Sequence, residues 1–157
     1  MGAPVKVIGL GNPLWTDEGL GYHVLEALRQ AELPPGVELI DGGTGGLNLL
    51  LPMTGAEQVI FVDAVRSGHP PGTVFRIPEG ELAAAPVRVK LSHAMGLDDV
   101  IRMYREVEGG QAEIVIYCVE AADVGTFGME LTPVVREKLP GLVQHILEEL
   151  RTKAASE

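Results

Sequence analysis

The sequence has little of what builds disulfide-linked, membrane-spanning or nucleic-acid-binding proteins. Its 157 residues include one cysteine, Cys118, which excludes a disulfide framework and a cysteine-rich zinc site. It has no apolar run close to the roughly 20 residues that cross a bilayer. Basic residues number 12 against 22 acidic ones, and a net charge of −10 disfavours contact with nucleic-acid phosphates or anionic lipid. We therefore expect neither nucleic-acid nor membrane partners.

The length and the amino terminus favour one cytoplasmic domain. A chain of this length buries roughly 70% of its unfolded surface and needs no metal or disulfide to hold a core. The first apolar segment, 5–10, lacks the cationic stretch and cleavage site of a signal peptide, so we interpret it as a strand. We expect a single cytoplasmic domain over residues 1–157, with residues 153–157 as a frayed tail.

Short apolar runs alternate with longer runs of helical period, which is typical of α/β proteins. We expect a three-layer sandwich in which a twisted, mostly parallel five-stranded sheet lies between helices. The continuous apolar run at 58–62 is typical of a central strand covered on both faces. The expected strands are 5–10, 37–40, 58–62, 73–77 and 113–119. The expected helices are 18–31, 47–51, 97–107 and one from Pro133 to the C-terminal tail.

Three segments are expected to be irregular. The segment 78–92 carries few signals of regular structure and is predicted to be the most mobile loop, and 120–130 is a second, glycine-containing loop. Pro140 lies with Gly141 inside the last expected helix, after the cap Thr132. Since proline cannot donate a helix hydrogen bond, we expect a kink or a short break there.

Polar side chains gather where the expected strands end, and open α/β sheets bind ligands at that edge. Carboxylates that meet there repel each other unless a cation or a proton lies among them. Two carboxylates and one imidazole suit zinc or nickel, and three protein ligands leave a position open for water or substrate. The residues expected at this edge are Asp17, Glu18, Asp41, Asp63 and His93.

The candidate metal ligands are Glu18, Asp63 and His93. Their spacing is no motif, because the fold must bring them together. Each is also explained as an exposed polar residue or a helix cap, since acidic side chains are normally exposed. Asp63 fits that alternative least well, because it directly follows an apolar strand.

Other chemistries are less well supported. Gly9 and Gly11 follow a strand, as in dinucleotide-binding folds, but the third glycine of that motif is replaced by Leu14 and acidic residues follow. We therefore expect no nucleotide cofactor. Cys118 lies inside an apolar strand, which favours a small core residue over a nucleophile. Trp15 is interpreted either as a substrate anchor or as a cover over the core.

The residues 7–21, VIGLGNPLWTDEGLG, closely resemble the opening of the hydrogenase maturation endopeptidases. Further matching blocks follow in the same order over almost the whole chain: 41–44 (DGGT), 61–64 (FVDA), 92–97 (SHAMGL) and 131–133 (LTP). The resemblance implies a twisted, mostly parallel sheet between helices. It also implies an enzyme that removes a short C-terminal extension from the large-subunit precursor of nickel–iron hydrogenase after nickel has been inserted.

The metal-contacting residues of that family match Glu18, Asp63 and His93, and Asp41 matches an acidic residue important for recognition or activity. The resemblance implies that the nickel belongs to the precursor and that the protease recognises it, while zinc or cadmium could replace it in a crystal. Two mechanisms stay open. Either the metal polarises the scissile carbonyl or activates water, or nickel only docks the substrate while Asp41 or Asp63 helps water attack.

Two rival functions remain. Peptidyl-tRNA hydrolases share the Gly-Leu-Gly-Asn-Pro opening at residues 9–13, but they need a histidine where this chain has Asp17 and Glu18, and a basic surface for RNA. The second rival is a related protein that binds nickel or a metal-loaded partner without cutting it. Cleavage of the precursor would separate this rival from the protease.

Overall fold

A five-stranded sheet forms the centre of the protein, as the apolar runs predict. The computed structural model describes residues 4–91 and 95–155. The strands lie in the order β2-β1-β3-β5-β4; the first four run parallel and β4 is antiparallel to β5. They are β1 (Val5–Leu10), β2 (Val37–Gly43), β3 (Gln58–Val65), β4 (Val74–Pro78) and β5 (Glu113–Glu120). The predicted fold class is confirmed.

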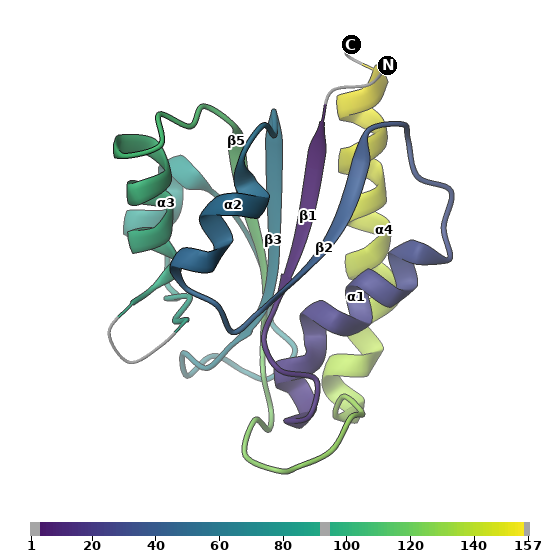
Figure 1. The fold of residues 1–157 in the computed structure, drawn as a ribbon. Helices are drawn as coiled ribbons and strands as arrows, with labels where there is room; N and C mark the ends of the chain where they lie inside the picture. The colour runs from purple at the N-terminus through teal and green to yellow at the C-terminus, as the bar shows by residue number, and fades with distance from the viewer. Residues whose placement is uncertain (1–3, 92–94, 156–157) are drawn as a thin grey trace.

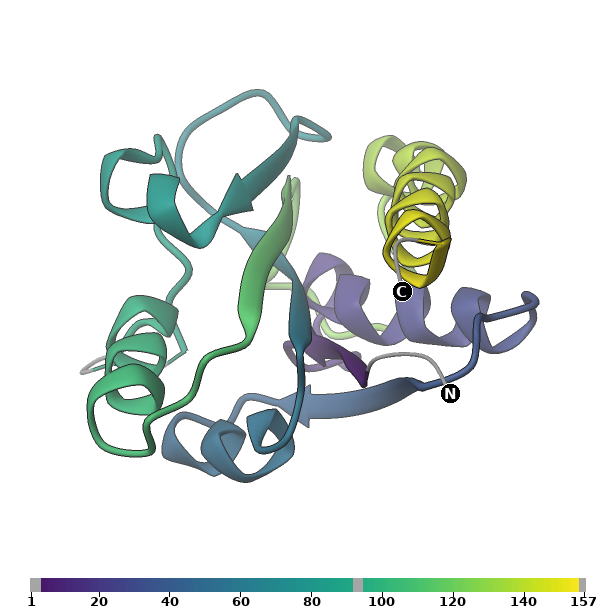
Figure 2. The same ribbon diagram turned by 90° about the horizontal axis from the view of Figure 1, so that it is seen from above.

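Helices cover both faces of the sheet (Figures 1 and 2), with α2 and α3 on one face and α1 and α4 on the other. The α-helices are α1 (Leu20–Arg29), α2 (Leu50–Met53), α3 (Leu97–Glu106) and α4 (Pro133–Ala155). Three short 3-10 helices are η1 (Thr16–Gly19), η2 (Leu47–Leu49) and η3 (Glu79–Ala84). Among residues 4–91 and 95–155, no helix is both long and apolar enough to cross a membrane.

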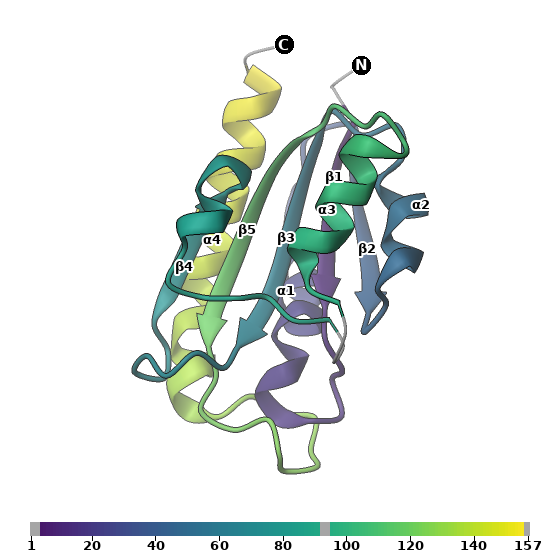
Figure 3. The same cartoon turned by 90° about the vertical axis from the view of Figure 1, so that its left-hand side faces the viewer.

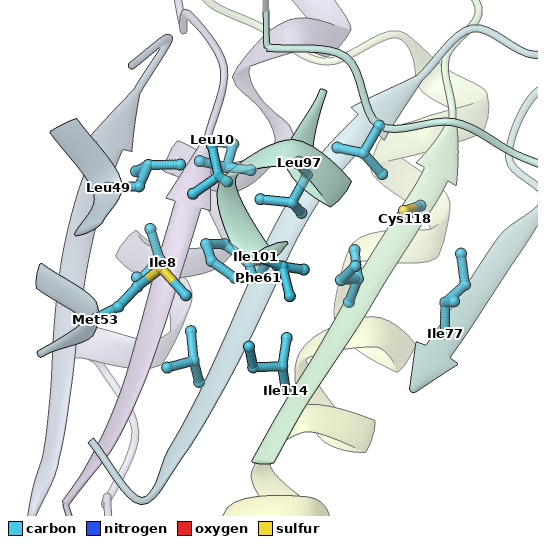
Figure 4. Packing of buried hydrophobic residues seen from close by; sticks show 14 of the residues in the cluster. Ile8, Leu10, Leu49, Met53, Phe61, Ile77, Leu97, Ile101, Ile114 and Cys118 are labelled. Carbon is cyan, nitrogen blue, oxygen red and sulfur yellow. The ribbon is translucent and has the colours of Figure 1, made fainter. Parts of the chain in front are cut away.

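Successive residues of the central strand β3 face opposite layers, so the protein has two apolar cores. The helix α3 lies over β3 (Figure 3). Phe61 packs with Ile8 and with Leu97 of α3 (Figure 4), and Cys118 is buried in the same cluster, as predicted. Ile60 belongs to the other cluster, with residues of α1 and α4. A β3 that is buried except at Ala64 and is flanked by two cores is what the continuous apolar run predicts.

Two strands extend further than predicted, and this changes the place of two acidic residues. Asp41 pairs with Gly9 inside β2, and Asp63 pairs with Cys118 inside β3, so neither follows its strand. The hydrogen bonds of the neighbouring strands outweigh the low strand preference of aspartate. The first helix is also shorter than expected: Glu18 lies in η1, and the α-helix begins at Leu20.

Two predicted irregularities differ from the structure. Segment 78–92 is partly regular, since residues 79–84 form η3, and Val87 and Val89 are buried. The helix α4, described throughout residues 133–155, runs without a break across Pro140. Proline removes one helix hydrogen bond, but the buried residues of α4 continue beyond it with Leu142 and Ile146, and this packing maintains the helix.

Two glycines bring α1 into direct backbone contact with β1. A Cβ atom at Gly9 would lie 2.7 Å from the carbonyl oxygen of Gly21, and one at Gly21 would lie 2.6 Å from the carbonyl oxygen of Leu10. No larger residue fits at either position without moving backbone. The contact fixes the start of α1, and η1 before it, beside the carboxyl end of β1.

Candidate active site

A pocket of about 700 Å³ lies at the carboxyl ends of β1, β2 and β3. It is the edge at which the sequence places the candidate site. Its lining comes from six separate segments of the chain: Leu10, Gly11, Glu18, Gly43, Thr44, Asp63, Ala64, Arg66, Lys90, Leu91 and Val124. Two of the predicted ligands, Glu18 and Asp63, therefore meet in one pocket although they are far apart in the sequence.

Asp63 is a buried carboxyl group, with 6% of the residue exposed. Its Oδ1 accepts a hydrogen bond of 2.9 Å from the backbone N–H of Ala64. Its pKa is raised to about 8, mainly by burial; the Ala64 hydrogen bond lowers the pKa, and the nearby charge of Glu18 adds to the rise. A buried carboxyl group beside a second one favours a proton or a cation between them.

Gly11 makes room for this pair. Its φ of +102° lies in the region that favours glycine, and a Cβ atom there would lie 2.1 Å from the carbonyl oxygen of Glu18. The same atom would lie 3.4 Å from Oδ1 of Asp63. Glu18 itself is half-buried. The chain thus passes between the backbone of η1 and the Asp63 carboxyl group only because residue 11 has no side chain.

Asp41 and His93 complete the predicted site residues. Asp41 is exposed and does not line the pocket; its Oδ1 accepts a hydrogen bond of 2.9 Å from the N–H of Gly43, where β2 is irregularly paired. Its catalytic role stays a prediction. His93 lies outside the described residues, but Leu91, two residues earlier, lines the pocket. Within 4–91 and 95–155, no three His, Cys, Asp or Glu side chains are placed to hold a metal ion.

Asp17 has a different role from its neighbour Glu18. It is fully buried, so the expectation that it lies at the pocket edge is wrong. Its carboxylate accepts hydrogen bonds from the backbone N–H groups of Ala122 (2.8 Å), Asp123 (3.1 Å) and Thr132 (2.8 Å), and from the Thr132 hydroxyl. Its own N–H donates to the carbonyl of Asp123. Asp17 therefore attaches the segment 121–132 to η1.

Comparisons with known proteins point to one family. Residues 22–149 match the hydrogenase maturation protease family. The chain is 32% identical to the hydrogenase 2 maturation protease of Escherichia coli, over 94% of this chain and 90% of that protein. It is also 32% identical to the hydrogenase expression/formation protein HupD of Thiocapsa roseopersicina, covering 93% and 67% of the two chains. This chain belongs to the hydrogenase maturation protease family.

The fold of this maturation protease is that of a solved relative. The hydrogenase maturating endopeptidase HybD from E. coli superposes with a TM-score of 0.81 at 32% identity, over 95% of this chain and 93% of that one. Membership of the family makes the chain a hydrolase that cleaves peptide bonds. It also decides against the peptidyl-tRNA hydrolase alternative, whose resemblance was confined to the opening glycine-rich segment.

The sequence did not single out the basic residues of the protease pocket. Arg66 and Lys90 both line it and both are exposed. Arg66 directly follows β3, so the rule that strand ends carry the site could have found it. Lys90 lies in a segment expected to be a mobile loop, which gave no signal. The pocket thus combines two carboxyl groups with two cationic side chains.

The raised pKa of Asp63 predicts how stability depends on pH. Between its usual value of 3.8 and about 8, the folded protein holds a proton that the unfolded chain releases, so the unfolding free energy falls as pH rises across this range. The slope from this group is at most about 1.4 kcal/mol per pH unit. Asp63→Asn removes that contribution, and urea unfolding of metal-free protein from pH 5 to pH 8 measures it.

The exposed Asp41→Asn variant is the control and should keep the pH dependence of the wild type. A pH dependence of Asp63→Asn as steep as that of the wild type would show that Asp63 is ionised in the folded protein at neutral pH. Above pH 8 the wild-type contribution is constant, so the two curves should run parallel there.

Proposed function

We propose that this protease removes the C-terminal extension of the nickel-loaded large-subunit precursor of nickel–iron hydrogenase. The relatives support it by name, since one is a hydrogenase 2 maturation protease. The observation that carries the proposal is the pairing of Glu18 and Asp63 in one pocket, where the charge of Glu18 disfavours the ionised form of Asp63. A divalent cation brought by the substrate would remove that repulsion.

We propose that the nickel of the precursor enters this pocket as part of the substrate and is contacted by Glu18, Asp63 and His93. Carboxylate oxygen and imidazole nitrogen together suit borderline ions such as nickel, zinc and cadmium. The position of Leu91 at the pocket supports the inclusion of His93, which follows two residues later. The protease then distinguishes a precursor that carries nickel from one that does not.

Cleavage requires a water molecule to attack the scissile carbonyl, and either the substrate's nickel or a carboxylate assists it. Among the two candidate bases, Asp63 is favoured by its position in the pocket. Asp41 is exposed and is not one of the residues that line the pocket. We further propose that the reaction takes place in the cytoplasm, where a free buried thiol such as Cys118 is ordinary.

The test compares nickel-loaded and nickel-free precursor at equal concentration. We expect the loaded precursor to lose its extension and the nickel-free precursor to be cleaved at least about 100-fold more slowly, because losing the charge that stabilises a reaction centre costs a factor of about 10²–10³. The mass of the large subunit, followed by mass spectrometry over time, measures both rates.

Equal cleavage of the two precursors would argue for a metal-independent protease. Tight binding of the loaded precursor without any change in its mass would support the non-cleaving alternative. Reloading the nickel-free precursor and recovering cleavage is the control that shows that the precursor itself was intact.

A further inference from the structure

We propose that exposed apolar side chains beside the pocket form the surface on which the folded body of the precursor docks. This inference rests on the proposed function, because the occupant is its substrate. The docking patch consists of Leu14 (40% exposed), Trp15 (38%), Phe127 (69%) and Met129 (52%). Exposed aromatic and sulfur-containing side chains that lie together are typical of protein–protein contact surfaces.

The residues of the docking patch come from two distant segments that lie side by side. The N–H of Thr16 donates to the carbonyl of Gly128, and the N–H of Gly128 donates to the carbonyl of Leu14, both at 2.8 Å. The rings of Trp15 and Phe127 meet edge to face, with centroids 5.8 Å apart. Figures 1 and 3 show the β5–α4 connection passing beside the chain that leads into α1.

The backbone under the docking patch is held by many polar contacts. Thr16 is buried and has a φ of 55°, which is rare for a β-branched residue and persists only where the surroundings hold it. Its hydroxyl donates to the carbonyl of Thr126. Asp123 accepts hydrogen bonds from Gly125 and Thr126, and Asp17 holds the start and end of the same segment. Apolar side chains on a prearranged backbone lose little entropy when a partner binds.

The same two segments line the pocket. Glu18 lies three residues after Trp15, and Val124 lies three residues before Phe127. When the C-terminal tail of a folded precursor enters the pocket, the body of the precursor must contact the surface that adjoins the pocket. The docking patch is part of that surface. Trp15 is also too exposed to serve only as a cover over the core. A lipid occupant is disfavoured by the net charge of −10.

The test replaces the most exposed member of the docking patch. We expect Phe127→Ala to raise the KM for nickel-loaded precursor about tenfold and to leave kcat unchanged, because the contact is made equally before and during the reaction. The double variant Trp15→Ala/Phe127→Ala should raise the KM further. The controls are Leu51→Ala in α2 and Val107→Ala after α3, two residues that are 81% and 70% exposed and lie outside the docking patch.

Direct binding of the same precursor to Phe127→Ala and to wild type gives an independent readout, in which we expect about tenfold weaker binding. If Phe127→Ala kept the KM and the precursor affinity of the wild type, the inference would be overturned. Cleavage of the precursor by the wild-type protein would still support the proposed function. If the wild-type protein did not cleave the precursor, the proposed function would fail. The difference in precursor binding between the wild type and Phe127→Ala would still test the docking patch. A wild-type dimer that Phe127→Ala converts to a monomer, with precursor affinity unchanged, would assign the patch to a second copy and overturn the inference.

Discussion

Glu18→Gln will fold as the wild type does and will cleave nickel-loaded precursor at least about 100-fold more slowly. Glutamine keeps the size of the half-buried side chain but carries no charge toward the nickel that we propose enters the pocket it shares with Asp63. The loss should appear in kcat, since the charge acts at the reacting centre. Mass spectrometry of the large subunit under single-turnover conditions measures the rate, and thermal unfolding verifies the fold.

Glu26→Gln is the matched control for this loss. Glu26 lies on α1, pairs with Arg29 and has 45% of its side chain exposed, so the same chemical change there should leave the cleavage rate unaltered. Cleavage by Glu18→Gln at the wild-type rate would remove Glu18 from the site. A slow Glu26→Gln protein would instead show that the rate responds to the charge of the whole molecule.

The fold was predictable because its signals are local. A continuous apolar run such as 58–62 indicates a covered strand by itself, and helical periods between such runs imply a layered α/β domain. The meeting of Glu18 and Asp63 was also predictable, since parallel strands carry their ligands at one edge. The resemblance to the maturation endopeptidases selected the same residues independently.

What the sequence did not show depends on contacts between segments that lie far apart in the chain. The extension of β3 through Asp63 requires β5 as its neighbour, and the irregular pairing at Asp41 requires β1. Lys90 reaches the pocket through a segment without periodicity. Leu14 and Phe127 belong to one patch only because the backbone of Gly128 forms hydrogen bonds with the segment that contains Leu14. None of these contacts can be predicted from the local amino-acid composition.

Asp17 and Glu18 show this limit most clearly, because adjacent acidic residues look equivalent in the sequence. They differ because the segment that begins at Ala122, 105 residues after Asp17, donates its backbone N–H groups to Asp17 and not to Glu18. The first of the two therefore maintains the structure around the site, while the second faces the pocket. Replacing each residue in turn should separate stability from activity.

Asp17→Ala should destabilise the protein by about 3 kcal/mol or more, because three backbone N–H groups lose their buried acceptor at roughly 1–3 kcal/mol each. For a chain of this size, that is a fall in melting temperature of about 6–12 °C. Urea and thermal unfolding measure it, with Glu18→Gln as the neighbouring control and Asp17→Asn, which keeps one acceptor oxygen, as an intermediate. An unaltered midpoint would mean that water replaces the carboxylate. A destabilised Asp17→Ala protein should also bind precursor more weakly, since the backbone under Phe127 is then no longer held.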